Sequence, residues 1–420
     1  MKPLYSKQYP FTYIVFGFFL HLIAFLIANM TGLQFVQAFV GMIGWWYIIK
    51  GFRKFSSVLR IPFHGFYRFL FVLYIILCAV MICRGYTIDY PYQWISIQGC
   101  INYHLFSPYY ILPYFMPFVA FIPVRYYKLG TSVRISYVVG IITIILFAVF
   151  YKEILASSLR QARGFSVEGD YSFGAFIPQF YINVAVIVLF RKYISNKVFL
   201  INCIGLSLSI LVNLIAARRG GSAIQLMLFV FNLYFLYKSV SSKYKILIVV
   251  ISAIIIIGCV YLFSDSDVFN FIKERGLEDT RSGVDKALLS QMNDWELIFG
   301  KGLNGRYYYP LSALEDDYLN GWRYASETGF YSLVLHGGYL LAFVYIAVLL
   351  LPALKGVFLS KNLLCKALGF YIILSLIELY PFGWPSFNFK FLMIWMGVSL
   401  CYNRQIRSLN DRQIKEYFFS

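Results

Sequence analysis

The sequence predicts an all-α protein that crosses a membrane about twelve times, with one large polar segment between the ninth and tenth spans. Three observations support this fold class. Hydrophobic residues make up 60% of the 420 residues, aromatic residues make up 20%, and the mean hydropathy is +0.68. Long apolar runs recur along the chain, and the polar segments between them alternate between basic and mixed charge. A soluble globule of this size could not cover so much apolar surface.

Each span is predicted from an apolar run long enough to cross the hydrocarbon core of a bilayer, which takes about 20 helical residues. The first run is too long for a secretory signal and no cleavage site of small residues follows it, so we expect a retained helix. In chain order the predicted spans are 11–29, 33–50, 62–83, 108–124, 134–151, 173–190, 198–217, 222–238, 246–264, 328–352, 364–380 and 386–402.

The charge distribution predicts the orientation of these spans. With the N-terminus inside, the inner segments hold 23 Lys and Arg residues and only Asp411 and Glu416, whereas the outer segments hold 14 basic and 17 acidic residues. Basic residues concentrate in cytoplasmic loops, so this pattern places both termini in the cytoplasm. The net charge of +18 therefore reflects membrane topology, and we expect no nucleic acid partner.

Three parts follow from this topology. Residues 1–264 hold spans one to nine, 265–326 form a large periplasmic loop, and 327–420 hold the last three spans and a cytoplasmic tail. Within the loop, Val284, Ala287, Leu288 and Met292 share one stripe, which predicts a short amphipathic helix over 282–297.

A glycine-rich run from Phe299 to Gly305 follows this helix. Glycines allow a close backbone approach at such a turn. The run lacks the Lys-Ser/Thr ending of a nucleotide phosphate loop.

The seven cysteines show no spacing typical of a metal site, and we expect neither a metal nor a cofactor. Five of them fall within spans. Cys83 and Cys100 both map to the outer side, where an oxidising compartment would permit a disulfide.

The sharpest departure from the charge rule is the pair Arg218 and Arg219, followed by Gly220 and Gly221, at the outer end of the seventh span. Positive charge at a translocated helix end is unfavourable unless an anion meets it. Guanidinium groups bind phosphate bidentately, and the glycines expose backbone N–H groups beside them. A phosphate site is the functional interpretation, and snorkelling of both side chains to lipid headgroups is the alternative.

Two further outer clusters contain charged residues that could join this site. The loop before the sixth span holds a cluster of basic and acidic residues, and a second cluster of charged residues precedes the tenth span. Glu327 stands at the predicted membrane surface, where a carboxylate beside arginines could accept a proton from a hydroxyl, although a helix-start carboxylate is the simpler explanation. His336 lies deeper and is expected to be a hydrogen-bonded core residue. The remaining candidates are Arg160, Arg163, Glu168 and Asp170 in the first cluster and Asp316, Asp317 and Arg323 in the second.

These motifs together resemble the O-antigen polymerases and the related O-antigen ligases. The resemblance covers roughly 152 to 345 and rests on short motifs. They are Arg163-Gly164 before a span, Arg218-Arg219-Gly220 between spans, Arg281-Ser282-Gly283 with Trp295 in the large loop, and the run from Leu297 to Gly302.

The resemblance implies periplasmic, inverting glycosyl transfer from a polyprenyl-diphosphate-linked glycan, without nucleotide sugar or metal. Ligases carry a His at the start of the span after the large loop, whereas this chain has Glu327 and Thr328 there, which favours a polymerase. Gly338 occupies the place of the family's first downstream glycine, and Leu341 replaces the second.

Together with this resemblance, the sequence predicts a polymerase of undecaprenyl-diphosphate-linked repeat units in a bacterial inner membrane. The expected partners are the donor glycan, the acceptor glycan and membrane lipids. A chain-length regulator protein is a further candidate partner. Glu327 is the predicted base. The predicted diphosphate ligands are Arg160, Arg163, Arg218, Arg219 and Arg281.

Two alternatives stay open. One is an O-antigen ligase that transfers glycan to lipid A core, and the other is a lipid-linked oligosaccharide flippase. A flippase needs ionisable residues along a central cavity, whereas nearly all the charge here lies outside the predicted spans or near their ends, as Arg68, Glu378 and Lys390 do.

Overall fold

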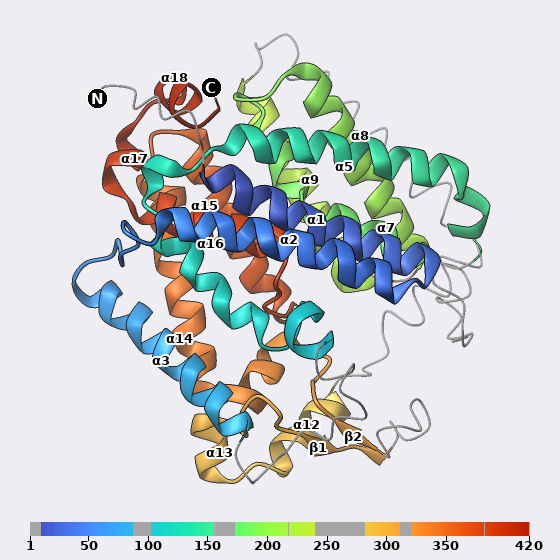
Figure 1. Ribbon diagram of the computed structural model, residues 1–420, viewed down its shortest axis with the longest axis vertical. Coiled ribbons are helices and arrows are strands. Elements are labelled where there is room, and N and C mark those ends of the chain that lie inside the picture. The colour runs from blue at the N-terminus through green and yellow to red at the C-terminus, as the bar shows by residue number, and fades with distance from the viewer. Residues whose placement is uncertain are drawn as a thin grey trace.

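The computed structural model describes residues 10–86, 102–154, 156, 173–216, 218–239, 282–310, 321–381 and 383–419. These residues are mostly helical (Figure 1). A short antiparallel pair joins β1 (Tyr307–Tyr308) to β2 (Trp322–Arg323). The predicted all-α class is confirmed.

Within this part of the chain, 7 helices are long and apolar enough to cross a membrane, which supports the predicted membrane character. The number of twelve is not confirmed, and the predicted span 246–264 lies outside the described residues. The helices are α1 (Pro10–Thr31), α2 (Gln34–Phe55), α3 (Gly65–Gly85), α5 (Leu129–Val149), α8 (Asn196–Ile215), α9 (Arg219–Ser239) and α14 (Gly329–Leu359).

Two predicted spans are not continuous α-helices. In 108–124 the structure has the 3-10 helix η2 (Leu112–Phe121), which contains prolines that cannot donate backbone hydrogen bonds. In 173–190, α7 (Phe173–Tyr181) gives way to the 3-10 helix η4 (Ala185–Phe190). Asn183 lies at the break. Its side-chain amide donates to Gln179 O at 2.9 Å, the carbonyl to which the Asn183 backbone N–H would donate if the helix continued.

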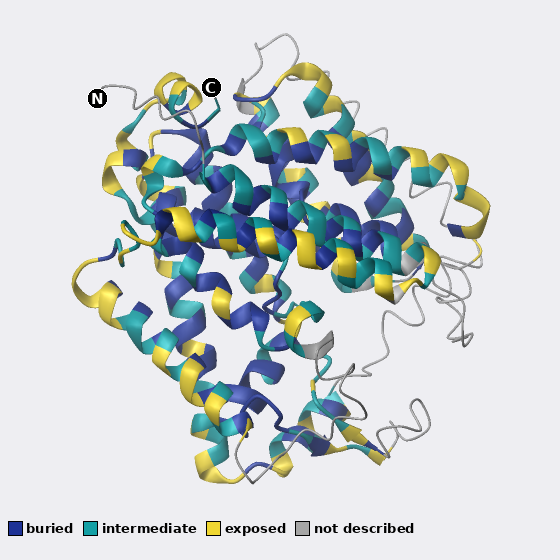
Figure 2. Ribbon diagram, in the orientation of Figure 1, coloured by how far each residue is buried: buried dark blue, intermediate teal, exposed yellow. Residues whose placement is uncertain are grey.

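The last two predicted spans are the short helices α15 (Leu363–Glu378) and α16 (Phe389–Tyr402). Every residue of α16 from Phe389 to Cys401 is buried, and Figure 2 shows both helices largely dark in the middle of the bundle. A helix that is apolar all round belongs in a core. The outer helix α2 instead exposes Phe35, Phe39 and Trp46, as expected of a surface that meets lipid.

The predicted amphipathic helix over 282–297 is two helices, α12 (Ser282–Ser290) and α13 (Asp294–Phe299). The single continuous helix was wrong because Asn293 starts a new one. Its side chain accepts from Glu296 N at 2.9 Å, and the Glu296 carboxylate accepts from Asn293 N at 2.9 Å, which is a capping box. The predicted apolar stripe is nevertheless buried at Val284, Leu288 and Met292.

The glycine-rich turn after α13 packs against a break in α14. Gly338 has φ of 72° and interrupts the helix, which frees the carbonyls of the preceding turn. Lys301 N donates to Leu335 O at 2.7 Å, and Gly302 N donates to His336 O at 2.9 Å. A Cβ on Gly300 would lie 2.3 Å from His336 C, so only glycine permits this approach. The turn packs against α14, because the N–H groups of Lys301 and Gly302 are already bonded to carbonyls of that helix.

The bundle has two distinct ends (Figure 1). The tail end holds the last turn of α14, the start of α15, and the short helices α17 (Arg404–Ser408), α18 (Asp411–Ile414) and η6 (Lys415–Phe419). The cavity end holds the start of α14, the last turn of α15, and α12 and α13, with η1 (Asn102–Phe106). The short 3-10 helix η3 (Val124–Tyr126) follows η2.

Candidate functional site

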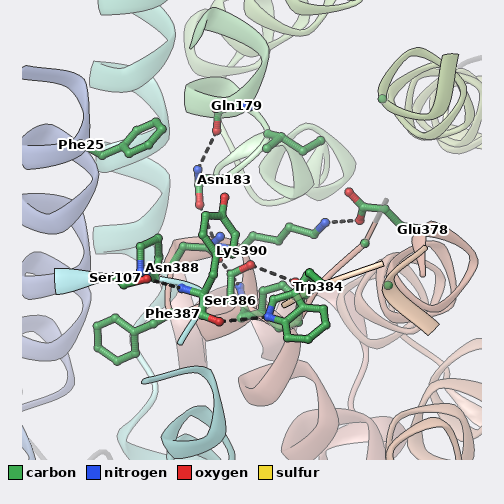
Figure 3. A pocket seen from close by; sticks show the side chains of 18 of the residues that line it. Phe25, Ser107, Gln179, Asn183, Glu378, Trp384, Ser386, Phe387, Asn388 and Lys390 are labelled. Carbon is green, nitrogen blue, oxygen red and sulfur yellow. Dashed lines mark hydrogen bonds and ion pairs between the residues drawn. The ribbon is translucent and has the colours of Figure 1, made fainter. Parts of the chain in front are cut away.

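A cavity of about 860 Å³ lies at the cavity end, between α1, α7, the α8–α9 turn, the start of α14 and the segment that joins α15 to α16. Figure 3 shows part of its wall, with polar side chains from α7 and the α15–α16 segment around it. Its volume falls within the range of cavities that bind small molecules. Among the described residues, the charged ones that line it are Arg218, Glu327, Glu378 and Lys390.

The α8–α9 turn presents Arg218 to this cavity. Arg218 N donates to Asn213 O at 2.9 Å, and Arg218 O accepts from both N (3.0 Å) and Oγ (2.9 Å) of Ser222. The backbone at Arg218 is thus held on both sides. Burial lowers the pKa of the Arg218 guanidinium. In the described part of the chain, no carboxylate lies within 4.0 Å of it, so the group is placed for an external anion.

Close backbone packing joins three distant segments around the cavity. A Cβ on Gly220 would lie 2.5 Å from Pro381 Cβ. The α8–α9 turn with Arg218, called the arginine turn below, therefore contacts the α15–α16 segment directly. That segment also contacts the start of α14, where Phe330 N donates to Leu379 O at 3.1 Å. Glycine at 220 therefore fixes the arginine turn against the α15–α16 segment.

Glu327 lies just before α14 and lines the same cavity. Its carboxylate pairs with Arg323 at 3.6 Å, and its side chain is 36% exposed. The helix cap is the next residue, Thr328, so Glu327 does not cap α14. A carboxylate that is partly exposed in a cavity can reach a substrate hydroxyl.

Asp285 of α12 holds the segment around Glu327 in place. Its Oδ1 accepts from Ser326 Oγ at 2.5 Å and from Thr328 Oγ1 at 3.3 Å, on either side of Glu327. The sequence analysis missed this residue, because its partners lie more than 40 positions away and no local pattern links them.

His336 also lines the cavity, but its side chain makes structural contacts and is buried. Its Nδ1 donates to Gly302 O at 3.0 Å, its ring meets the Trp384 ring edge-on at 5.4 Å, and it is 4% exposed. The prediction of a hydrogen-bonded core histidine is confirmed.

The cavity also contains an ion pair that was not predicted as part of the site. Lys390 Nζ bonds Glu378 Oε2 across the α15–α16 segment (Figure 3). The signal was present in the sequence, since these are two of the few charges near the ends of predicted spans.

The structure does not test the remaining predicted residues. Arg219 begins α9, but its side chain is outside the description, and Cys100, the predicted partner of Cys83, lies outside the described residues. The other predicted site residues outside them are Arg160, Arg163, Glu168, Asp170, Arg281, Asp316 and Asp317.

No family model, curated protein or solved structure matches this chain. The chemistry of the cavity must therefore be inferred from its own residues. Its described lining contains a guanidinium, an ammonium, two carboxylates, several amides and aromatic rings. Such a lining suits a ligand that carries an anionic group at one place and hydroxyl groups at another.

Proposed function

We propose that this protein is a membrane glycosyltransferase that polymerises polyprenyl-diphosphate-linked oligosaccharide repeat units. The acceptor sugar hydroxyl attacks the anomeric carbon of the donor, and the bond from that carbon to the phosphate oxygen breaks. The polyprenyl diphosphate leaves as an anion, and the hydroxyl proton passes to a carboxylate. Attack from the face opposite the leaving group inverts the anomeric configuration.

The observation that carries this proposal is that Arg218 and Glu327, more than 100 residues apart, line the same cavity. Arg218 is the described group best placed to bind the diphosphate, because it is half-buried and has no carboxylate partner in the described residues. It would stabilise the charge that develops on the leaving group. Glu327 would accept the proton of the attacking hydroxyl.

The lining of the cavity fits a glycan as well as an anion. Tyr109, Tyr324 and Trp384 supply aromatic rings, and Gln179 and Asn183 supply amides that can hydrogen-bond hydroxyl groups. The motifs at Arg218 and in the 297–302 run resemble those of O-antigen polymerases, which is the second support for this substrate class.

In this proposal the cavity end faces the periplasm of the inner membrane and the tail end faces the cytoplasm, as the distribution of basic residues predicts. A reporter enzyme that is active only in the periplasm tests the orientation. We expect activity when it is fused after Gly300 and none when it is fused after Lys243. The opposite pattern would place the cavity in the cytoplasm and exclude the proposal.

The function is tested by the glycan of a strain that lacks the gene. A missing polymerase leaves single repeat units on lipid A core, and wild-type gene restores long chains. Unmodified core in the deletion strain would instead indicate the ligase or the flippase. Complementation with a substitution at the tail end that should not affect activity, such as Arg412→Ala, provides a control for expression.

A further inference from the structure

The ion pair of Glu378 and Lys390 has no role in the reaction proposed above. Both side chains line the cavity, and they are only 19% and 9% exposed. Within the described residues, each is the other's ion-pair partner. The pair lies in the wall seen in Figure 3, where the lysine extends along the cavity toward the end of α15.

The helix ends disfavour both charges. Glu378 is the last residue of α15 and Lys390 is the second residue of α16. A helix carries partial negative charge at its C-terminus and partial positive charge at its N-terminus, so each side chain sits at the end that repels it. Buried ion pairs can often be replaced by neutral residues without loss of stability. Fold stability therefore gives no reason for charge at these positions.

The surroundings of the pair indicate what the ammonium could bind. Pro381, three residues after Glu378, touches Gly220 beside Arg218. The Lys390 backbone N donates to Asn183 Oδ1 at 3.4 Å, which ties the start of α16 to the break after α7. The arginine turn and the ion pair are thus parts of one wall. A diphosphate carries more negative charge than a single arginine neutralises.

We propose that Lys390 is a second binding residue for the diphosphate of the lipid-linked donor, and that Glu378 is the positioning residue that holds it. This inference rests on the proposed function, which supplies the diphosphate. An ammonium has three donors, so Lys390 can keep its bond to Glu378 and still donate to a phosphate oxygen. The carboxylate offsets the unfavourable burial of the ammonium while the cavity is empty.

The test compares binding of two lipids to the purified full-length protein in detergent. The probes are undecaprenyl diphosphate and the neutral alcohol undecaprenol. The key variant combines Glu378→Gln with Lys390→Met, which removes both charges, leaves no unpaired one and keeps similar side-chain lengths. A Glu378→Gln, Lys390→Gln variant, whose amides can bond each other, makes the same measurement if methionine prevents folding.

We expect the neutral variants to bind the diphosphate roughly 10- to 100-fold more weakly than wild type, the effect of losing a hydrogen bond to a charged group. Their undecaprenol affinity should not change. Lys390→Arg keeps the charge and should bind the diphosphate within a few-fold of wild type. The matched control removes the tail-end pair with Lys192→Met and Asp411→Asn and should leave both affinities unchanged.

The outcomes separate two kinds of failure. If wild type does not prefer the diphosphate over undecaprenol, the proposed function itself fails. If wild type prefers the diphosphate and a folded neutral variant keeps that preference in full, Lys390 does not contact the diphosphate and this inference is overturned. A loss of affinity for undecaprenol as large as that for the diphosphate would also overturn it, because it would indicate a damaged cavity.

Discussion

Helix α15 has a carboxylate and a lysine at each end, and the two pairs differ in the other contacts that the carboxylate makes. At the tail end, Asp411 Oδ1 accepts from Leu363 N at 2.7 Å and Tyr193 Oη at 2.6 Å, and its Oδ2 accepts from Lys192 Nζ at 2.8 Å. At the cavity end, the described contact of the Glu378 carboxylate is its ion pair with Lys390.

The difference separates a structural charge from one that is available to a ligand. Asp411 sits at the positive end of α15 and has several donors, so its charge stabilises the fold. Burial raises the pKa of Asp411, but hydrogen bonds from Lys192, Tyr193 and Leu363 outweigh it and bring the pKa below its ordinary value. Glu378 sits at the negative end, beside a cavity. The first pair should therefore govern stability and the second should govern binding.

The largest effect is expected from Glu327→Gln, which keeps the size of the side chain and removes the proton acceptor. Loss of a general base lowers turnover by roughly 100- to 10,000-fold, whereas donor binding should survive. The control is Glu416→Gln at the tail end, because Glu416 also pairs with an arginine four residues away. Polymer synthesis can be followed as a ladder of glycan lengths. A normal ladder at normal expression would move the base to another acidic residue or to none.

Arg218→Ala should lower polymer synthesis by roughly 30- to 1000-fold, because it removes a charge-assisted contact to the leaving group. Arg218→Lys should restore only part of it, since the bidentate fork is lost. The same loss is predicted for Arg219→Ala. Near wild-type polymer from the double alanine variant, with the protein inserted normally, would show that both side chains only snorkel to headgroups.

Gly338→Ala should destabilise the cavity end by more than about 3 kcal/mol, because it adds backbone strain and a steric clash. Its φ is 72°, and a Cβ would lie 2.0 Å from Ile298 O. Gly65 at the start of α3 provides the control, since its φ of 57° is similar but nothing lies within 4 Å of its Cβ position. Gly65→Ala should cost about 1 to 2 kcal/mol from strain alone. Equal losses in thermal unfolding would show that the turn after α13 does not pack as described.

The smallest effect is expected from Asp411→Asn, which should lower the free energy of unfolding by about 1 to 3 kcal/mol and leave turnover per folded molecule unchanged. The lowered pKa of Asp411 means that its contribution is present at neutral pH and is lost as the pH falls through the region below about 4. Thermal unfolding as a function of pH should therefore show a weaker acid dependence in the variant. A loss of polymer from folded Asp411→Asn protein would remove the distinction between the two ends.

The long apolar helices could be predicted from sequence because length and hydropathy determine them locally. The breaks could not, because they depend on particular side chains: Asn183 bonds back to Gln179, and Asn293 caps a new helix. The assignment of Glu327 and Arg218 to one site rested on the predicted topology and on the family resemblance, and in the structure both residues line one cavity. The contacts of Asp285 are tertiary and no pattern along the chain reveals them. The charges of Glu378 and Lys390 were visible near the ends of predicted spans, but their pairing and their place in the cavity wall were not.

The most direct test uses purified protein in liposomes with a single polyprenyl-diphosphate-linked repeat unit as both donor and acceptor. We expect wild type to produce a ladder that grows by one repeat unit per step, and Glu327→Gln and Arg218→Ala to produce almost none. Tail-end variants such as Arg412→Ala should match wild type. Wild-type protein that inserts correctly and leaves the substrate at one repeat unit would contradict the proposed polymerase.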